Sequence, residues 1–389
     1  MKVLHTSDWH IGKRLLGRER INEQKEVLFE IVDICEKENI QLVLVAGDVF
    51  DTYLPSSEAE DLFYTAIKAL AGRDRVVVII SGNHDDSVRL SAATSLSEEY
   101  GIYIYGNCSH VPSLKSDRKT HPVRAGVNFI EIENEIGEKV FINVLPYPTE
   151  ARFKEDRRIE EIFFDKITRW INAGEVENVN NSPSIFLSHI FIAGGKVSEG
   201  EREIDLGGAR AVPLELLPKS DYIALGHLHR KQKCGDLNAF YSGSILQYAF
   251  DEANCDKKVL IFDIEKDGVK NLQEVNLVKG KQLVRLAVNS VEQALELLPK
   301  YENSYVELTL YLSEPLTSLQ IKELKDKNDG LISIVPQISG IAGEVGKISR
   351  KNLSSSQLFI EFYKNTFGTE PSEDLISLYL ELSEAENET

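Results

Sequence analysis

The sequence predicts an α/β protein built from layered sheets and helices. Two observations support this class. Short apolar runs at residues 42–46 and 76–80 are rich in β-branched residues and bounded by glycine, which is typical of buried core strands. Segments with helical spacing, at residues 23–38 and 58–70, each precede one of these runs. Strands that alternate with helices favour a fold in which the strand ends converge on one site.

Further strands are expected in order along the chain. One begins at residues 3–4, and apolar runs at residues 184–187 and 222–225 give two more. Residues 259–264 and 275–278 complete this large unit. Glycine can adopt sharp turns without a steric penalty. We therefore expect the backbone to turn sharply after three of the strands, at Gly47, Gly82 and Gly226.

Polar blocks follow five of the strands and contain the side chains that metal ions prefer. Five of the eight histidines fall in these blocks. Imidazole and carboxylate together bind Mn²⁺, Fe or Zn²⁺, whereas a set of thiolates would have pointed to structural zinc. The sequence therefore predicts a hydrolytic metal centre, and its candidate ligands are Asp8, His10, Asp48, Asn83, His189, His227 and His229.

Each block taken alone also has an ordinary structural interpretation. His189 could be a hydrogen-bonded core histidine, and residues 82–85 could be a plain turn, since Gly, Asn and Asp form turns. Asp48 and Asp51 could cap helices. The order of all five blocks, each after an expected strand, favours the metal centre.

The same blocks carry a resemblance to a known family. Their order (Asp-x-His, Gly-Asp-x-x-Asp, Gly-Asn-His-Asp, His, Gly-His-x-His) resembles the calcineurin-like metallophosphoesterases, which implies a β-sandwich flanked by helices. Within that superfamily the chain is similar to the nucleases of bacterial double-strand-break repair. The finer matches lie at residues 6–12, 47–51, 82–85, 89–91, 226–229 and 241–244.

The resemblance implies two metal positions that share one carboxylate. Position 1 would be formed by Asp8, His10, Asp48 and His229, and position 2 by Asp48, Asn83, His189 and His227. Family members typically use Mn²⁺, and paired metals in phosphoester hydrolysis lie about 3.5–4 Å apart. His84 matches the family's histidine that contacts the scissile phosphate and protonates the leaving oxygen. Asp51 and Asp85 are expected to orient imidazoles from outside the ligand set.

The net charge of −18 at first argues against a protein that binds DNA, because basic surfaces are the usual mark of such proteins. The local distribution is more favourable, since charges beyond ~8 Å are largely screened at physiological salt. We predict a basic rim around the centre that contacts phosphates rather than bases, the alternative being an ordinary solvated surface. It comprises Lys13, Arg14, Arg89, Arg230 and Lys231.

The rest of the composition limits the class of protein. A chain of 389 residues is long enough for two or three domains. Its apolar runs of about five residues are far shorter than the ~20 that a membrane span needs, and no leader is expected before the first strand. The four cysteines form no C-x-x-C pair, which fits a reducing cytoplasm, beside the nucleoid if the substrate is DNA.

The expected domain organisation has four parts. Residues 1–278 form the phosphoesterase domain, and residues 279–339 a small α+β unit, where the resemblance implies a capping domain. Residues 340–349 contain spaced glycines and are expected to be a linker. Residues 350–389 are expected to form two amphipathic helices, too short to be stable alone.

The tail helices need a surface to pack on. They pack either on the chain's own core or, as the resemblance implies, on the coiled coil of an ATPase partner. The chain lacks a G-x-x-x-x-G-K-[ST] phosphate loop, so any ATP dependence must come from another subunit. The resemblance also implies a homodimer within a heterotetramer.

Three functions fit these observations. The leading one is a manganese-dependent DNA nuclease subunit, with exonuclease action on duplex ends and endonuclease action on single strands or hairpins. The second is a phosphoesterase for small substrates, which would share the motifs but need neither the cap nor the tail. The third is a non-catalytic scaffold, which the complete set of seven ligands and His84 disfavours.

Overall fold

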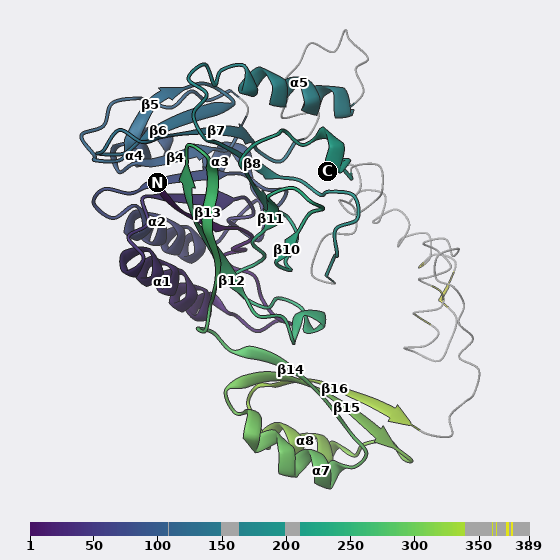
Figure 1. The fold of residues 1–389 in the computed structure, drawn as a ribbon. Coiled ribbons are helices and arrows are strands. Elements are labelled where there is room, and N and C mark those ends of the chain that lie inside the picture. Colours follow the sequence, from purple (N-terminus) through teal and green to yellow (C-terminus); the bar gives the residue numbers. More distant parts are fainter. Residues whose placement is uncertain are drawn as a thin grey trace.

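The main body of the protein is a sandwich of two sheets with helices on its outer faces (Figure 1). One apolar core fills the space between the two sheets. A second core lies between the first sheet and its helices, and a third lies between the second sheet and its helix. The predicted class, an α/β sandwich flanked by helices, is confirmed. The computed structural model describes residues 1–107, 109–148, 163–198 and 211–338, with the single residues 360, 363, 371, 372 and 375.

The first sheet is mostly parallel, with the strand order β13-β12-β1-β2-β3-β4. Strands β1 to β4 run parallel to one another, and β12 runs antiparallel to β1. Its strands are β1 Lys2–Thr6, β2 Leu42–Ala46, β3 Val76–Ile80, β4 Ile102–Tyr105, β12 Lys258–Glu265 and β13 Gly268–Asn276. Its helices are α1 Ile21–Lys37, α2 Ser57–Ala71, α3 Ser87–Leu90 and α4 Thr94–Glu99.

Burial on both faces explains the continuous apolar sequence of β2. Val43 and Val45 pack toward the helices, while Leu42 and Leu44 face the second sheet. A strand covered on both sides presents no polar face, so its sequence does not alternate. The following helix, α2, begins where the Ser56 hydroxyl accepts a hydrogen bond from a backbone N–H of the first turn. The strands expected at residues 3–4, 42–46, 76–80 and 259–264 and both expected helices are confirmed, whereas the expected run at 275–278 shares only residues 275–276 with β13.

The second sheet has the order β10-β11-β9-β8-β7-β6-β5. Its central strands β7, β8, β9 and β11 are parallel, and its two edges are antiparallel. Its strands are β5 His121–Ala125, β6 Phe129–Glu133, β7 Lys139–Leu145, β8 Ser184–His189, β9 Tyr222–Gly226, β10 Gln232–Lys233 and β11 Ala239–Tyr241. Helix α5, Phe163–Glu175, packs on its outer face through Ile167 and Ile171.

The capping unit is a separate three-stranded sheet with the order β14-β15-β16. It contains β14 Gln282–Val288, α7 Val291–Leu297, β15 Ser304–Leu312, α8 Ser318–Lys327 and β16 Leu331–Ile338, with the 3-10 turn η3 Leu298–Tyr301 after α7. We expected an α+β arrangement. The strands are instead all parallel and alternate with the helices, because each helix carries the chain back to start the next strand.

The capping unit is joined to the main body by a partly buried ion pair at the start of α1. The guanidinium of Arg20 pairs with Glu23 at 2.8 Å, donates to the carbonyl oxygen of Gln247 and lies over the ring of Tyr305 on β15. The Tyr305 hydroxyl donates to Glu23 at 2.8 Å, and the Leu283 N–H on β14 donates to the Gln247 side chain at 2.6 Å. Polar contacts thus fix the cap to α1 and to the segment after β11.

The expected domain boundary near residue 278 falls between the end of β13 and the start of β14. The expected linker, 340–349, lies outside the described residues. The expected tail, 350–389, also lies outside them except for a few single positions. Within the described part of the chain, no helix has both the length and the apolar character to cross a membrane.

Candidate metal centre

The seven candidate ligands lie together, at the ends of strands from both main sheets. Asp8, Asp48 and Asn83 follow β1, β2 and β3 of the first sheet. His189 ends β8 of the second sheet, and His227 follows β9. These side chains, with those of His10 and His229, are all buried. The sandwich therefore gathers ligands from distant parts of the sequence into one cluster.

Position 1 contains two imidazoles whose Nε2 atoms face each other. His10 Nε2 lies 3.0 Å from His229 Nε2 and 3.5 Å from a carboxylate oxygen of Asp48. His229 Nδ1 lies 3.4 Å from the Glu252 carboxylate and His10 Nδ1 lies 3.5 Å from the Asp51 carboxylate, and where both neutral rings carry the proton on Nδ1 their Nε2 lone pairs face each other. Two lone pairs at this distance repel each other unless a cation lies between them. With Asp8 beside both rings, the donor set fits a divalent metal ion.

Position 2 brings an amide oxygen and two imidazoles against the other side of Asp48. The side-chain oxygen of Asn83 lies 2.9 Å from His189 Nε2 and 3.1 Å from His227 Nδ1. His189 Nε2 is also 3.5 Å from Asp48 Oδ1. Because His189 Nδ1 faces the carbonyl oxygen of Ala46 at 2.8 Å, its Nε2 lone pair points at acceptor oxygens. Either a proton or a cation must lie there, which again fits a metal ion.

The backbone is strained at four of the candidate ligands. Asp8, His10, Asp48 and His227 have φ angles of 52°, 45°, 51° and 112°. Positive φ is uncommon outside glycine and persists only where the surroundings impose it. The His227 N–H donates to Asp8 Oδ1 at 3.0 Å, and the His84 N–H donates to Asp48 Oδ1 at 2.9 Å. These hydrogen bonds hold the strained loops in place and aim the carboxylates into the cluster.

The three glycines predicted to permit sharp turns serve two different purposes. Gly47 does have a positive φ of 85°. Gly82 and Gly226 provide space instead. A Cβ on Gly82 would lie 2.0 Å from Asp48 Oδ1, and one on Gly226 would lie 1.8 Å from the carbonyl oxygen of Ala46. The strand ends therefore pack so closely that a side chain at either position would displace a candidate ligand or its support.

Burial and mutual charge shift the protonation of the cluster. Burial raises the pKa of Asp8 to about 8, and the charge of Asp48 adds to the effect. Burial alone would raise the pKa of Asp48 too, but the positive charge of His189 and of His84 holds it well below its usual range. Burial lowers the pKa of His189, yet the charge and hydrogen bond of Asp48, with the charge of Asp8 and the Ala46 carbonyl, together raise it to about 9. The cluster therefore retains protons that a divalent cation would displace.

His84 lies at the edge of this cluster. Its ring packs edge-on against that of His10, with centroids 4.7 Å apart, and its Nδ1 lies 2.7 Å from the carbonyl oxygen of Asp51. Nε2 is therefore the nitrogen left for a substrate. The Asp51 carboxylate lies 3.5 Å from His10 Nδ1, so Asp51 is placed to orient an imidazole.

Asp85 supports the backbone of the ligand loops. Its carboxylate accepts hydrogen bonds from the N–H groups of Val49, Phe50 and Gly82 at 3.1, 2.9 and 2.8 Å. It thereby ties the loop after β2 to the loop after β3. We expected Asp85 to orient a ring, but the contacts described for it fix the loops that carry Asp48 and Asn83.

Several supporting residues escaped the motif analysis. Glu252 is buried, lies 3.4 Å from His229 Nδ1 and pairs with the buried Lys257. Tyr248 packs its ring against His10, with centroids 5.6 Å apart, and the Ser7 hydroxyl donates to Asp8 at 2.5 Å. Only Ser7 lies inside a recognisable motif. A glutamate and a lysine five positions apart have no distinctive spacing, so no sequence signal marked them.

The five residues of the predicted basic rim are all paired within the chain. Lys13 pairs with Asp51 at 3.0 Å, and Arg230 with Asp251 at 2.9 Å. The remaining pairs are Arg14 with Glu19, Arg89 with Glu60 and Lys231 with Glu274. The rim is therefore a mixed-charge surface, and a bound phosphate would have to compete with these carboxylates.

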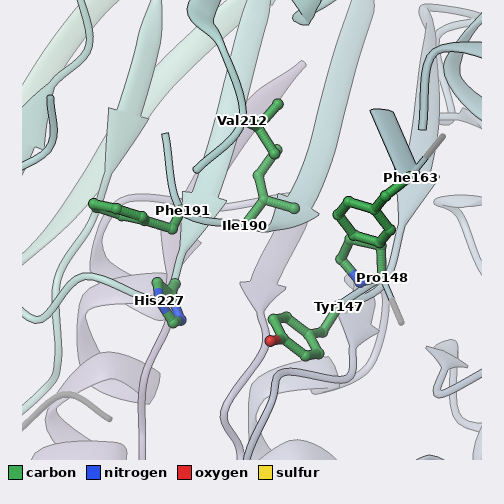
Figure 2. Close-up of a pocket in the computed structure, with 7 residues that line it drawn as sticks. All are labelled: Tyr147, Pro148, Phe163, Ile190, Phe191, Val212 and His227. Carbon is green, nitrogen blue, oxygen red and sulfur yellow. The ribbon is translucent and has the colours of Figure 1, made fainter. Parts of the chain in front are cut away.

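A narrow apolar crevice adjoins position 2 (Figure 2). Tyr147, Phe163 and Phe191 line it, and His227 forms the wall that it shares with the cluster. The rings of Tyr147 and His227 are nearly parallel, with centroids 6.5 Å apart. Burial lowers the pKa of His227 to about 3, so this ring stays neutral and its nitrogens remain available to a cation.

Comparison with known proteins assigns the class that the fold and the cluster define. Residues 1–231 match the family model of the calcineurin-like phosphoesterases. The chain is 37% identical over 398 aligned residues to the SbcD chain of the nuclease SbcCD from Bacillus subtilis, covering 98% of both chains. It is 27% identical to the SbcD chain of the nuclease SbcCD from Staphylococcus epidermidis, over 94% of this chain and 93% of that one. The chain therefore belongs to the calcineurin-like phosphoesterases and, within them, to the SbcD family.

A solved structure of a dimetal phosphatase from Danio rerio is a more distant match. It has 10% sequence identity and a TM-score of 0.39, and the match covers 72% of this chain and 98% of that one. The family assignment does not depend on it.

Proposed function

We propose that this chain is the nuclease subunit of an SbcCD-type complex and hydrolyses DNA phosphodiesters with two divalent metal ions, most suitably Mn²⁺. The observation that carries the proposal is the pair of ligand sets meeting at Asp48, in a chain similar to nuclease subunits over almost its full length. Position 1 takes Asp8, His10, Asp48 and His229, and position 2 takes Asp48, Asn83, His189 and His227. Bound there, two cations neutralise phosphate charge and lower the pKa of water.

The chain's own residues supply the remaining chemistry. His84 contacts the scissile phosphate through Nε2 and gives a proton to the leaving oxygen, while the carbonyl oxygen of Asp51 fixes the ring. The Asp51 carboxylate, 3.9 Å from His84 Nδ1, stabilises positive charge on the ring. Asp51 also orients His10, and Asp85 holds the loops. Such general acid catalysis contributes typically 10²–10⁴-fold to the rate.

DNA contacts of this chain are directed to phosphates and carry no sequence preference. Lys13, Arg14, Arg89, Arg230 and Lys231 exchange their carboxylate partners for phosphate oxygens. Each such contact adds to the salt dependence of binding. Reversing the charge of Arg14 and Arg89, the two most exposed of the set, should flatten that dependence. An unchanged salt slope would reject the rim.

The partner in this proposal is an SbcC-type ATPase with a coiled coil, since the chain has no phosphate loop of its own. Residues 350–389 dock on that coiled coil, and the unit 279–339 controls access of DNA to the centre. Cleavage is then ATP-dependent, with exonuclease action on duplex ends and endonuclease action on single strands and hairpins, in DNA repair and recombination. We place this complex in the cytoplasm, beside the nucleoid.

A homodimer is proposed through the face made by α2, α3 and α4. The Arg89–Glu60 pair joins α3 to α2 at 2.7 Å. Val88 and Leu96 are exposed on this face, at 72% and 67%. Exposed apolar side chains of this size favour a self-complementary contact. Leu96→Glu should convert the dimer to a monomer in sedimentation, whereas unchanged sedimentation would reject this face.

The function is tested by Mn²⁺-dependent cleavage of a linear duplex and of a hairpin, with bis(p-nitrophenyl) phosphate as a small substrate. Wild type and His84→Ala are compared with and without the partner ATPase and ATP. DNA cleavage that requires Mn²⁺ and His84, and that rises with partner and ATP, supports the proposal. Hydrolysis of the small ester without DNA cleavage under any condition would assign a small-substrate phosphoesterase instead.

A further inference from the structure

The two metal positions differ in the groups that contact the imidazole nitrogens facing away from the cluster. In position 1, His10 Nδ1 faces the Asp51 carboxylate at 3.5 Å and His229 Nδ1 faces the Glu252 carboxylate at 3.4 Å. Both rings therefore have a carboxylate on the side away from the cluster: Glu252 is hydrogen-bonded to His229, whereas Asp51 faces His10 Nδ1 without a hydrogen bond.

Position 2 lacks such carboxylates among the described residues. His189 Nδ1 faces a neutral backbone carbonyl, that of Ala46, at 2.8 Å. His227 uses Nδ1 toward Asn83, and its Nε2 is buried without a hydrogen-bond partner. The amide of Asn83 is neutral as well, whereas Asp8, which lies near His10 and His229 and also near Asp48 and His189, gives position 1 a second carboxylate in the proposed assignment.

Glu252 is held in place by a buried ion pair with Lys257. It belongs to the 3-10 turn η2, Phe250–Glu252, and is fully buried. The ammonium group of Lys257 donates to the Glu252 carboxylate, to the hydroxyl of Ser244 at 2.8 Å and to the carbonyl oxygen of His229 at 2.8 Å. All three N–H donors of Lys257 are used, and Lys257 and Glu252 together hold the backbone and the ring of His229.

A carboxylate behind a metal-binding imidazole has two effects. It fixes the tautomer, so that Nε2 carries the lone pair, and it makes the ring a stronger ligand. Removing such a carboxylate typically weakens metal binding by 10–100-fold. In the described structure the charged partners lie behind His229 and His10, whereas His189 is oriented by the neutral carbonyl of Ala46 and His227 has no carboxylate behind it.

We propose that Glu252, clamped by Lys257, is a positioning residue for His229, and that position 1 binds a divalent cation more tightly than position 2 and fills first. This rests on the ligand assignment in the proposed function. It adds an order of loading: the ion at position 1 stays with the protein, and the ion at position 2 exchanges with the medium.

The test is a titration of the full-length chain with Mn²⁺ alone, with free Mn²⁺ measured by electron paramagnetic resonance. Wild type should show two classes of site that differ by roughly tenfold or more in affinity. Glu252→Gln should weaken the tight class by roughly 10–100-fold and leave the weak class unchanged. Asn83→Ala should weaken only the weak class. Glu133→Gln, a glutamate on β6 paired with Lys139, serves as the matched control and should change neither.

A second variant guards against misfolding. Glu252→Gln leaves the buried Lys257 without its carboxylate, so the double variant Glu252→Gln/Lys257→Met removes both charges together. It should keep the wild-type circular dichroism spectrum and still lose affinity at the tight class only. A merely structural role for the pair would weaken both classes together, and that result overturns the proposal.

Two other outcomes separate this inference from the proposed function. Two Mn²⁺ sites of equal affinity in a chain that still cleaves DNA would overturn the loading order and leave the nuclease assignment intact. A chain that binds no Mn²⁺ at all would overturn both.

Discussion

Replacing Gly226 with alanine tests whether the two sheets must touch for the centre to form. A Cβ on Gly226 would lie 1.8 Å from the carbonyl oxygen of Ala46 and 2.8 Å from His189 Nδ1. Ala46 ends β2 of the first sheet and Gly226 ends β9 of the second, so the substitution acts where the sheets meet. It also disturbs both partners of the contact that orients His189.

The expected effect follows from this geometry. Real Cβ contacts essentially never fall below 3.0 Å, so the carbonyl oxygen and the new Cβ must separate by about 1.2 Å. Overpacking of a tight core lowers the free energy of unfolding by about 1–3 kcal/mol. A displacement of about 1 Å at a reacting centre reduces the rate by about 10²-fold. We therefore expect kcat/KM for bis(p-nitrophenyl) phosphate to fall by about 100-fold.

The assay compares Gly226→Ala with Gly137→Ala in Mn²⁺-dependent ester hydrolysis and in urea unfolding. Gly137 lies in the turn before β7, and no atom lies within 4 Å of its added Cβ, although its φ is +82°. The control should lose about 1 kcal/mol of stability and keep its activity. Wild-type activity and stability in Gly226→Ala would refute the argument that space at this glycine sets the position of His189.

Three further predictions concern metal binding and the supports of the fold. Mn²⁺ at 100 times its dissociation constant should raise the free energy of unfolding by about 2.7 kcal/mol and EDTA should reverse this; a melting temperature insensitive to both would contradict the metal assignment. Asp85→Ala leaves three buried N–H groups without their acceptor, so urea unfolding should show a loss of at least ~3 kcal/mol, and a loss below ~1 kcal/mol would contradict its role. Burial would raise the pKa of Glu23, but hydrogen bonds and charge from Arg20 lower it. Its stabilising effect is therefore present above the unfolded pKa of about 4.5 and is lost as the pH falls through the lower folded value. The stability difference between wild type and Glu23→Gln should shrink below pH ~4.5, and a pH-independent difference would contradict this.

Much of the fold could be predicted because local signals agree with tertiary burial. The run at residues 42–46 is apolar throughout since it lies between two cores, and the helical spacing of residues 58–70 matches the buried face of α2. The parallel order inside the cap could not be predicted in this way. Parallel and antiparallel pairing both accept strands such as β14 and β15, and the choice depends on how the intervening helix packs.

The ligand set could be proposed because each candidate follows a strand in a short polar block. The residues that support the candidate ligands through hydrogen bonds and ion pairs could not be predicted. Glu252 contacts the His229 ring only because the fold brings η2 next to that ring. Lys257, just before β12, donates a hydrogen bond to the backbone carbonyl oxygen of His229. Asp85 was proposed as a carboxylate that orients an imidazole, and its direction toward backbone N–H groups could not be predicted because it depends on how two loops pack.

The division of ligands between the two sheets has a consequence for synthesis of the chain. In the proposed assignment, position 1 needs His229 and position 2 needs His227, and both emerge from the ribosome after more than half of the polypeptide has been made. A nascent chain that stops before residue 227 thus carries at most three of the four ligands of either position. A truncated product therefore has no complete hydrolytic centre, and the capacity to cut arises only when the main body is almost finished.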